Sequence, residues 1–310
     1  MRAVRNTEQG IEVAEVADPA GDGMRVRTRS AGICGSDLAM AAQGPIPVTL
    51  GHELAGVLDD GTPVAVEPIV PCGTCDQCRA GDYSRCRTGA GIFLGVGADG
   101  GMADELRVPE RALVPLPVGV RVEDACLIEP LAVVAHGFRL AGVEAGARVG
   151  VVGGGSIGLC AVASAATAGC DVGLAARYEH QARAGERLGA APASGEYDVV
   201  VEAAGAEQSL ALAAELCAPG ATLLVLGTYW GTMPVPGLVA IMKELRSVST
   251  IAYGSHGAGR DIDTAAALLA SRPQIADVLV THRFALDDAA GAFRVAADRK
   301  AGAIKVVLEP

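Results

Sequence analysis

The feature that most constrains the fold is a run of glycines between an apolar segment and a segment of small residues, VGVVGGGSIGLCAVASAATAG at residues 149–169. It contains the pattern G-x-G-x-x-G at Gly153, Gly155 and Gly158. In such a unit the first glycine permits a tight turn, the second lets a pyrophosphate approach the backbone, and the third lets helix and strand pack closely. The segment is nearly uncharged, but its glycines favour a buried strand, turn and helix over a membrane span. We therefore expect a doubly wound α/β sheet that binds a dinucleotide; a glycine-rich turn without a ligand is the alternative.

Alternating strand and helix patterns follow the glycine motif. Apolar runs at 197–205 and 221–231 are typical of buried parallel strands that end in glycine turns, and the segment 206–220 between them is typical of an amphipathic helix. Further candidate cofactor contacts are Ser156 and Ile157 of the glycine motif and Gly227 of the second apolar run. An apolar helix at 264–274, broken by Pro273, is expected to close this domain.

Length, composition and charge limit the remaining possibilities. A chain of 310 residues exceeds the usual size of one core, so two domains are expected. A net charge of -11 argues against a general affinity for nucleic acid or an anionic membrane, which leaves a small-molecule partner. Residues 1–16 contain no apolar run of signal-peptide length and alternate like a strand, which predicts a cytoplasmic protein.

Four cysteines are gathered in VPCGTCDQCRAGDYSRC, residues 70–86. The spacing C-x2-C-x2-C-x7-C lets one loop offer four thiolates to a single tetrahedral ion, a closed structural zinc site. Disulfides are the weaker interpretation, because nine cysteines are an odd number and a reducing compartment disfavours bridges. The predicted ligands are Cys72, Cys75, Cys78 and Cys86.

A second set of residues is suited to catalysis. Cys34 lies in GICGSD, His52 and Glu53 lie in LGHELAGV, and Glu129 lies in EPLAVVAHG. One thiolate, one imidazole and one carboxylate would form an open zinc site with a free position for water or a substrate oxygen. Each residue alone has a simpler explanation, such as a core cysteine, a hydrogen-bonded histidine or a Glu-Pro turn. Their order along the chain, together with the cysteine loop, favours the metal site.

The succession of motifs resembles the zinc-dependent medium-chain dehydrogenase/reductase family, the alcohol and polyol dehydrogenases. The resemblance runs over essentially the whole chain, and the Glu-Pro at Glu129 resembles the sorbitol and threonine dehydrogenase branch. The motifs that carry it, in order, are GICGSD, LGHELAGV, PVAVEP, the four-cysteine loop, GGMADELRVP, EPLAVVAHG, VVGGGSIG and the C-terminal AFRVAADRKAGAIKVVLEP.

The resemblance implies the architecture. It implies a discontinuous, GroES-like, β-rich catalytic domain at 1–134 and 273–310 with a structural zinc lobe at about 70–88, and a Rossmann domain at 135–272. It also implies a homodimer or homotetramer with two zinc ions in each chain, one catalytic and one structural.

The resemblance also implies roles for individual residues. Ser36 would contact the substrate oxygen and pass its proton outward, although a helix-capping serine is the alternative. Asp37 would accept a hydrogen bond from the far nitrogen of His52, or simply cap a helix. Either Glu53 or Glu129 would complete the catalytic zinc site. Cys126 would be an ordinary buried thiol.

The end of the second strand of the nucleotide domain indicates which cofactor binds. An enzyme that uses NAD usually places an acid about 20 residues after the first glycine. Counted back from ERLGA, which is similar to the family's following helix end, that position is Ala176; Arg177 follows, and Asp171 precedes the strand. An absent carboxylate beside an arginine favours NADP over NAD, with His180 as a second contact. A solvated surface charge is the alternative role of Arg177.

Substrate identity is open at this stage. Phe93, Leu94, Tyr229 and Trp230 are candidate pocket residues, with surface or interface packing as the alternative. Ala39 lies near the place where polyol dehydrogenases often carry a histidine, so a secondary alcohol or ketone is expected. An NADPH-dependent imine or iminium reductase and an NAD-dependent polyol dehydrogenase are the alternatives. The ligand set argues against a zinc-free quinone or enoyl reductase and against a catalytically silent binding protein.

Overall fold

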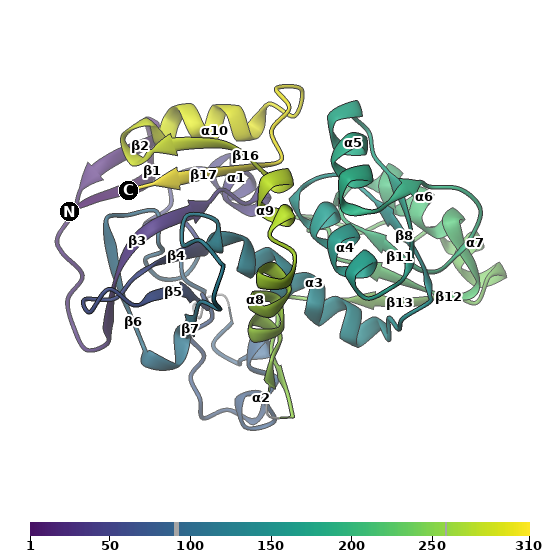
Figure 1. Cartoon of the computed structure of the whole chain (residues 1–310), viewed down its shortest axis with the longest axis horizontal. Coiled ribbons are helices and arrows are strands. Elements are labelled where there is room, and N and C mark those ends of the chain that lie inside the picture. Colours follow the sequence, from purple (N-terminus) through teal and green to yellow (C-terminus); the bar gives the residue numbers. More distant parts are fainter. Residues whose placement is uncertain (90–92, 258) are drawn as a thin grey trace. The chain divides into compact units, whose positions relative to one another are not determined.

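The computed structural model describes residues 1–89, 93–257 and 259–310. The chain forms two compact units (Figure 1). Unit 1 contains Met1–Glu129 and Gly254–Pro310, and unit 2 contains Pro130–Tyr253. The predicted mixed α/β architecture, a β-rich domain and a doubly wound domain, is confirmed.

Unit 1 is built on a largely antiparallel sheet of seven strands with the order β16-β17-β3-β4-β5-β7, in which β6 also pairs with β3. A separate hairpin joins β1 to β2, and a short one joins β14 to β15. The strands of unit 1 are β1 (Arg2–Thr7), β2 (Gly10–Glu15), β3 (Met24–Gly32), β4 (Glu53–Val57), β5 (Pro63–Val66), β6 (Glu105–Val108), β7 (Leu113–Pro115), β14 (Ser255–His256), β15 (Gly259–Arg260), β16 (Val280–Ala285) and β17 (Lys305–Glu309).

The helices of unit 1 cover this sheet and connect its strands. Figure 1 shows α10 beside β16 and β17, where Phe293 packs into a core with Leu50 and Val306. The helices are α1 (Gly35–Ala41), α2 (Asp76–Arg79), α8 (Asp261–Ser271), α9 (Gln274–Leu279) and α10 (Ala289–Ala297). Helix α3 (Ile128–Ala141) begins in unit 1 and continues into unit 2.

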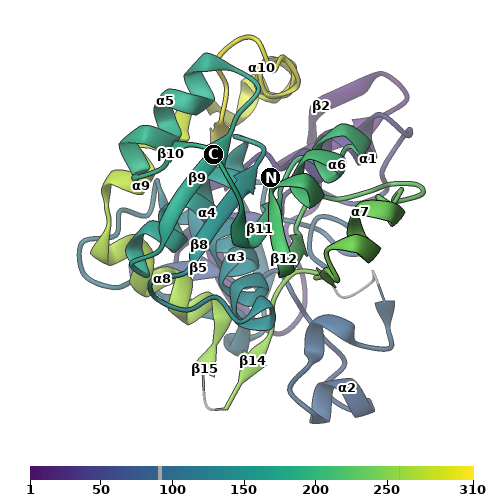
Figure 2. The ribbon, with the colours of Figure 1, turned by 90° about the vertical axis from the view of Figure 1, so that its right-hand side faces the viewer.

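Unit 2 is a six-stranded parallel sheet with the order β10-β9-β8-β11-β12-β13. The strands β9, β8, β11 and β12 lie side by side in Figure 2. The sheet strands are β8 (Arg148–Val152), β9 (Asp171–Ala175), β10 (Ala191–Pro192), β11 (Tyr197–Glu202), β12 (Cys217–Val225) and β13 (Arg246–Ser249). The helices are α4 (Ser156–Thr167), α5 (Glu179–Leu188), α6 (Glu207–Leu216) and α7 (Gly237–Met242).

The connection from β10 to β11 is short, at residues 193–196, and an aromatic side chain covers the sheet beside it. A Cβ atom at Gly150 would lie 2.8 Å from the Tyr197 ring, and a Cβ atom at Gly173 would lie 1.9 Å from the Tyr197 hydroxyl oxygen. The Arg148 guanidinium lies 4.8 Å from the centre of the same ring. The two glycines therefore make room for a ring that lies directly on the backbone of β8 and β9.

The boundaries of the two units differ from the predicted ones. The first lies after Glu129 rather than after residue 134, and the second lies after Tyr253 rather than after residue 272. The predicted apolar helix at 264–274 is α8, which packs against β7 and β15 and so groups with unit 1 instead of closing the nucleotide domain. Pro273 ends it as expected, because α9 begins at Gln274.

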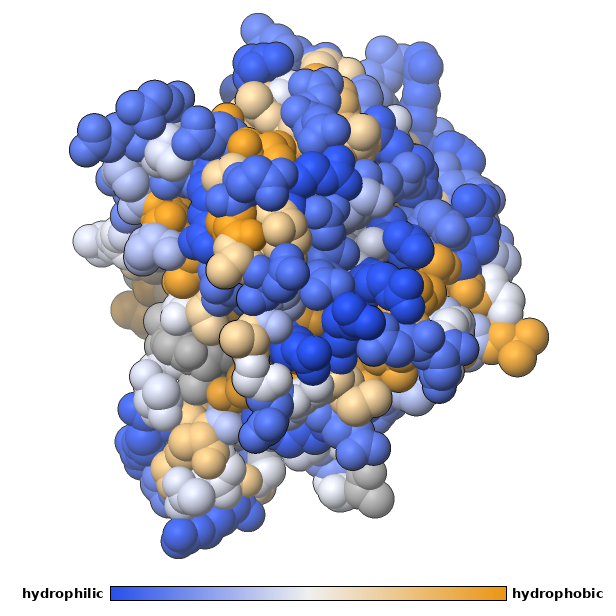
Figure 3. Space-filling view, turned by 90° about the vertical axis from the view of Figure 1, so that its left-hand side faces the viewer, coloured by the Kyte–Doolittle hydropathy of each residue, from blue (hydrophilic) through white to orange (hydrophobic). Residues whose placement is uncertain are grey.

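Among the described residues, no helix has both the length and the apolar character that crossing a bilayer requires. Figure 3 shows one face of the molecule, on which hydrophilic residues predominate and apolar residues form separate small groups.

Candidate functional site

Three of the predicted catalytic residues meet at the ends of two paired strands. Gly32, the last residue of β3, pairs with Glu53, the first residue of β4, so Cys34 and His52 lie just beyond the same end of this strand pair. The ligand atoms of Cys34, His52 and Glu53 all lie within 4.8 Å of one another. A Cβ atom at Gly32 would lie 2.2 Å from Glu53 Oε2, so glycine is needed there to admit the carboxylate. Thiol, imidazole and carboxylate are donors that zinc accepts, so this set fits the predicted ion.

The first turn of α1 supports two of these side chains. Asp37 is fully buried, and its Oδ2 accepts a 2.8 Å hydrogen bond from the Cys34 backbone N–H. Asp37 Oδ1 lies 3.4 Å from His52 Nδ1, and Ser36 Oγ lies 3.3 Å from His52 Nε2 on the other side of the ring. Burial lowers the pKa of His52, but the charges of Asp37 and Cys34 outweigh burial and raise it well above its usual range.

Glu129 is the second residue of α3 and is buried. It is not part of the group of three ligand atoms within 4.8 Å of one another. Burial raises its pKa to about 8, and Glu53 adds to the shift, whereas His52 opposes it. Cys126 is also fully buried, and burial raises its pKa to about 12, as in an unreactive core thiol.

The sequence interpretation missed one charged residue at this site. Lys305, in β17, is 1% exposed and donates hydrogen bonds to both carboxylate oxygens of Glu53. Burial lowers its pKa, but the charge of Glu53 more than compensates and raises it. The signal available in the sequence was a lysine directly before the apolar run VVL, since a charged residue inside a buried strand needs a partner.

The four cysteines of the loop at 72–86 also come together. Their sulfur atoms lie within 4.8 Å of one another, and each of the nine cysteines is a free thiol. Cys75 Sγ lies 3.4 Å from Cys78 Sγ and 4.0 Å from Cys86 Sγ. The Thr74 hydroxyl and nearby backbone N–H groups lower the pKa of Cys72 to about 5, which favours the thiolate that a metal needs.

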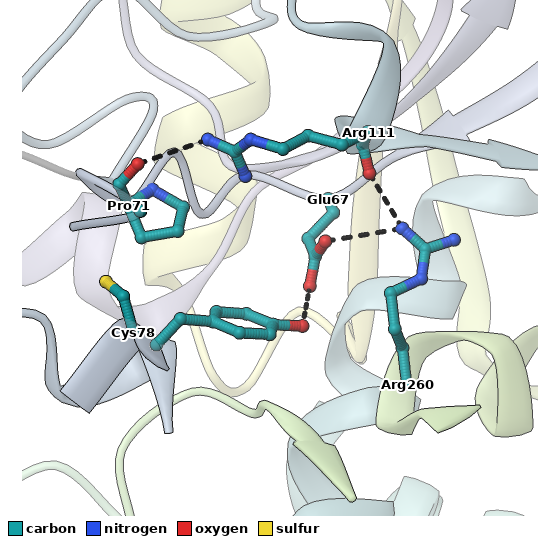
Figure 4. A pocket seen from close by; sticks show the side chains of 7 residues that line it. Glu67, Pro71, Cys78, Arg111 and Arg260 are labelled. Atoms are coloured by element: carbon teal, nitrogen blue, oxygen red, sulfur yellow. Dashed lines mark hydrogen bonds and ion pairs between the residues drawn. The ribbon is translucent and has the colours of Figure 1, made fainter. Parts of the chain in front are cut away.

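A buried polar cluster attaches this loop to the sheet (Figure 4). The Tyr83 hydroxyl donates a 2.5 Å hydrogen bond to Glu67 at the end of β5, and Arg260 Nη1 lies 3.4 Å from the other Glu67 oxygen. Arg260 also donates to the carbonyl oxygen of Arg111. The side chains line a cavity of about 210 Å³ beside Cys78. Burial raises the pKa of Glu67, and the hydrogen bond from Tyr83 and the charge of Arg260 oppose this shift because they favour the charged carboxylate.

The glycine motif has the predicted geometry of strand, turn and helix. Gly153 follows β8 with a φ of +110°, and Ser156 and Ile157 begin α4. A Cβ atom at Gly158 would lie 1.8 Å from the Gly153 carbonyl oxygen, whereas one at Gly155 would meet no described atom within 4 Å. The third glycine therefore serves packing, and the second leaves open space above the turn.

Three further predicted cofactor residues, Arg177, His180 and Gly227, follow strands of the same parallel sheet. Ala176 directly follows β9, and Arg177 is exposed. The Arg177 guanidinium lies 5.6 Å from the Tyr178 ring centre, and the Tyr178 and His180 rings stack at 5.7 Å. Gly227 follows β12, where a Cβ atom would lie 2.4 Å from both Glu202 Oε2 and the Gly205 nitrogen.

The candidate substrate residues have different surroundings. Leu94 is buried in the core of the unit 1 sheet, and Phe93 next to it is partly buried. The Tyr229 hydroxyl donates to the Ala206 carbonyl oxygen at 3.0 Å, while Trp230 is 54% exposed. Leu94 is thus accounted for by packing.

Comparison with known proteins identifies the family of this chain. The model of the alcohol dehydrogenase GroES-like domain matches residues 20–118. Galactitol 1-phosphate 5-dehydrogenase of Escherichia coli K12 is 31% identical over 333 aligned positions, which cover 95% of this chain and 96% of that protein. The chain belongs to the zinc-dependent medium-chain dehydrogenase family. It is accordingly an oxidoreductase of the alcohol and polyol dehydrogenase type, as predicted.

Solved structures of the family have the same fold over the whole chain. The crystal structure of galactitol-1-phosphate dehydrogenase from Escherichia coli superposes with a TM-score of 0.89 at 31% identity, covering 100% of both chains. A zinc-binding dehydrogenase from Sinorhizobium meliloti 1021, bound to NADP, superposes with a TM-score of 0.86 at 28% identity and covers 100% of this chain and 99% of that one.

Proposed function

We propose that this dehydrogenase transfers hydride between NADP(H) and a secondary alcohol or ketone, or a polyol-like substrate, with one catalytic and one structural zinc in each chain. The observation that carries the proposal is that the ligand atoms of Cys34, His52 and Glu53 lie within 4.8 Å of one another. Glu129, the other carboxyl group predicted from the sequence, is buried. The separate group of four cysteines supports the structural zinc, since a closed set of four thiolates leaves no position for a substrate.

The residues around the proposed catalytic ion have complementary tasks. Zinc bound there would act as a Lewis acid on the substrate oxygen. Asp37 beside Nδ1 favours the proton on that nitrogen, which leaves the Nε2 lone pair of His52 free for a metal. Asp37 also fixes the Cys34 backbone. Ser36 Oγ, on the Nε2 side of the ring, is placed to hold the proton that leaves the substrate hydroxyl.

The substrate class is supported by the relatives. Galactitol 1-phosphate 5-dehydrogenase is named for reaction at carbon 5 of a polyol, which carries a secondary hydroxyl group. Ala39, within α1, contributes no polar group, so we favour a secondary alcohol with few polar contacts at that wall over a sugar alcohol with many hydroxyl groups.

The proposed preference for NADP rests on the residues after β9. No carboxylate occupies position 176, and the exposed Arg177 lies beside the stacked rings of Tyr178 and His180. A guanidinium held against aromatic rings suits a phosphate group. Arg177→Ala should weaken NADP(H) binding and leave NAD(H) binding nearly unchanged. The control is Arg187→Ala, because Arg187 is an exposed arginine on α5, the helix that follows Arg177. An equal loss for both cofactors would contradict this role of Arg177.

Self-association is also proposed. Three apolar side chains of α7, Leu238, Ile241 and Met242, are each at least 74% exposed, and β13 forms an edge of the sheet in unit 2. Exposed apolar groups of this kind are typical of interfaces. Light scattering should give a mass of two or four chains; a monomer would refute it.

The decisive experiment combines metal analysis with a substrate screen. We expect two zinc ions per chain, and absorbance of the reduced cofactor should rise with a secondary alcohol or fall with its ketone. Ser36→Ala should reduce alcohol oxidation strongly while zinc content stays unchanged. Unchanged turnover would instead favour reduction of an imine or iminium, in which no alkoxide is protonated.

A further inference from the structure

A carboxyl group is buried at the carboxyl end of the parallel sheet in unit 2. Glu202 is the last residue of β11 and is 0% exposed. Its Oε1 lies within hydrogen-bond distance of three donors, the backbone N–H groups of Ala204 at 2.8 Å and Gly205 at 2.9 Å and the Ser209 hydroxyl at 2.6 Å. Its Oε2 is buried without a hydrogen-bond partner, and no described cationic residue pairs with the side chain.

The bonding pattern indicates that Glu202 carries a negative charge. Three donors that face one oxygen favour the ionised carboxylate. A proton on Oε2 would have no acceptor among the described residues, so the neutral acid would leave a buried donor unsatisfied. Ser209 lies in the first turn of α6, whose N-terminus contributes a partial positive charge beside Oε1.

Hydrogen bonding alone does not explain why a glutamate stands here. A glutamine has the same shape, its carbonyl oxygen could accept the same three bonds, and Oε2 forms no bond that an amide nitrogen would lose. A buried anion without a cation is also costly, whereas a neutral amide avoids that cost. Gly227 must lack a side chain to admit the group, because a Cβ atom there would lie 2.4 Å from Glu202 Oε2. What glutamate adds over glutamine is therefore the charge itself.

This charge lies on the nicotinamide side of the proposed cofactor site. A dinucleotide lies across the carboxyl ends of the strands, with its pyrophosphate at the glycine turn and its adenosine ribose at the end of the next strand. In this chain these places are the turn at Gly153 after β8 and Ala176 after β9. Strands β11 and β12 lie on the other side of β8 (Figure 2), so the nicotinamide half is expected over their ends. Gly205 and Gly227, which follow these two strands, both contact the Glu202 side chain.

We propose that the fixed negative charge of Glu202 makes the site prefer the oxidised cofactor, because it attracts the positively charged ring of NADP+ and not the neutral ring of NADPH. This inference rests on the proposed NADP(H)-dependent function. In carbonyl reduction a hydride, with both electrons, leaves the neutral ring for the carbonyl carbon, a proton from water is added to the oxygen, and the ring becomes a cation. Glu202 therefore shifts the equilibrium between the bound forms toward NADP+ and alcohol, which is the direction of carbonyl reduction.

The test measures the dissociation constants of NADP+ and NADPH by calorimetry, in the whole zinc-loaded enzyme without substrate. Glu202→Gln should raise the ratio of the NADP+ constant to the NADPH constant by about tenfold, since it removes a unit charge inside the protein. Ser209→Ala removes a donor but no charge, so it should leave this ratio within about twofold of the wild type. A change below about threefold in Glu202→Gln, or a fall in the ratio, would overturn the proposal.

Asp198→Asn is the matched control for charge. Asp198 lies in the same strand but is exposed near its other end, where water and salt screen its charge. The ratio should therefore stay at the wild-type value, and a shift as large as that of Glu202→Gln would overturn the proposal.

A measurement on the wild type keeps the test valid if Glu202→Gln does not fold. The wild-type enzyme should bind NADP+ at least as tightly as NADPH, and tighter binding of NADPH would overturn the role of Glu202. Binding of neither NADP(H) nor NAD(H) would refute the proposed function instead, which distinguishes the two failures.

Discussion

Replacing the glycines of the cofactor turn one at a time should separate packing from cofactor binding. At Gly158, in the first turn of α4, a Cβ atom would lie 1.8 Å from the carbonyl oxygen of Gly153 and 2.9 Å from its carbonyl carbon. A carbon and an oxygen normally approach to about 3.3 Å, so helix and turn would have to separate by about 1.5 Å. The obstacle is backbone, which no rotamer change can move aside.

The expected cost of Gly158→Ala follows from two opposing effects. Overpacking costs about 1–3 kcal/mol, and a clash with backbone belongs at the upper end of this range. Alanine in place of glycine in a helix returns about 1 kcal/mol. The net loss is about 2 kcal/mol, which for a unit of this size lowers the melting temperature by roughly 8 °C.

Gly155→Ala is the matched control in the same turn. Gly155 has a φ of -78°, which alanine adopts freely, and a Cβ atom there meets no described atom within 4 Å. Its melting temperature without cofactor should therefore stay close to that of the wild type. The new methyl group would project into the space that the pyrophosphate is expected to approach, so binding of NADP(H) should fall by about tenfold or more.

Calorimetry without cofactor and fluorescence titration with NADPH measure the two effects. If Gly158→Ala unfolds at the wild-type temperature, or if Gly155→Ala destabilises the protein as much as Gly158→Ala does, the two glycines do not have these separate roles.

Three further predictions concern the unit 1 sheet and its cysteine loop. Tyr83→Phe removes the hydroxyl donor of the buried Glu67 carboxylate and should cost about 1–3 kcal/mol in urea unfolding; a loss below about 0.3 kcal/mol would mean that the hydrogen bond contributes little. Burial alone would raise the pKa of Asp104, but the hydrogen bonds from Arg2 lower this pKa below the ordinary value of 3.8. The Asp104 carboxylate therefore contributes its full stabilisation above pH 3.8, and this stabilisation is lost as the pH falls through the pKa of the folded state. Asp104→Asn should accordingly lose less unfolding free energy than the wild type between pH 5 and about pH 2, and parallel pH profiles would contradict this. Cys75→Ser should reduce the zinc content by one ion per chain and, with cobalt in place of the catalytic zinc, leave the visible spectrum of that site unchanged, whereas loss of both metals would show that the two sites are not independent.

Local patterns were sufficient for much of the fold. The strand, glycine turn and helix at 149–169 and the strands and helix between residues 197 and 225 depend on short-range periodicity and on turns that only glycine forms readily, so they were predicted correctly. The cysteine loop was equally accessible, because its four thiols lie within 15 residues and a loop of that length can close on itself. The assignment of helix α8 to the nucleotide domain was wrong for the opposite reason: an apolar periodicity predicts a buried face but not the strands that bury it, and α8 packs against β7 and β15 of unit 1.

The sequence by itself determined the chemical inventory of this protein: a thiol, an imidazole and carboxyl groups in a spacing that suits zinc, a glycine turn for a dinucleotide, and a position after β9 without an acid. Only the tertiary structure decided how the charges are paired. Lys305 is 252 residues from Glu53 in the chain and Arg260 is 193 residues from Glu67, and each pair forms because sheet pairing or helix packing brings distant segments together. A buried charge must find a partner wherever the fold provides one, and no local pattern specifies which partner that is.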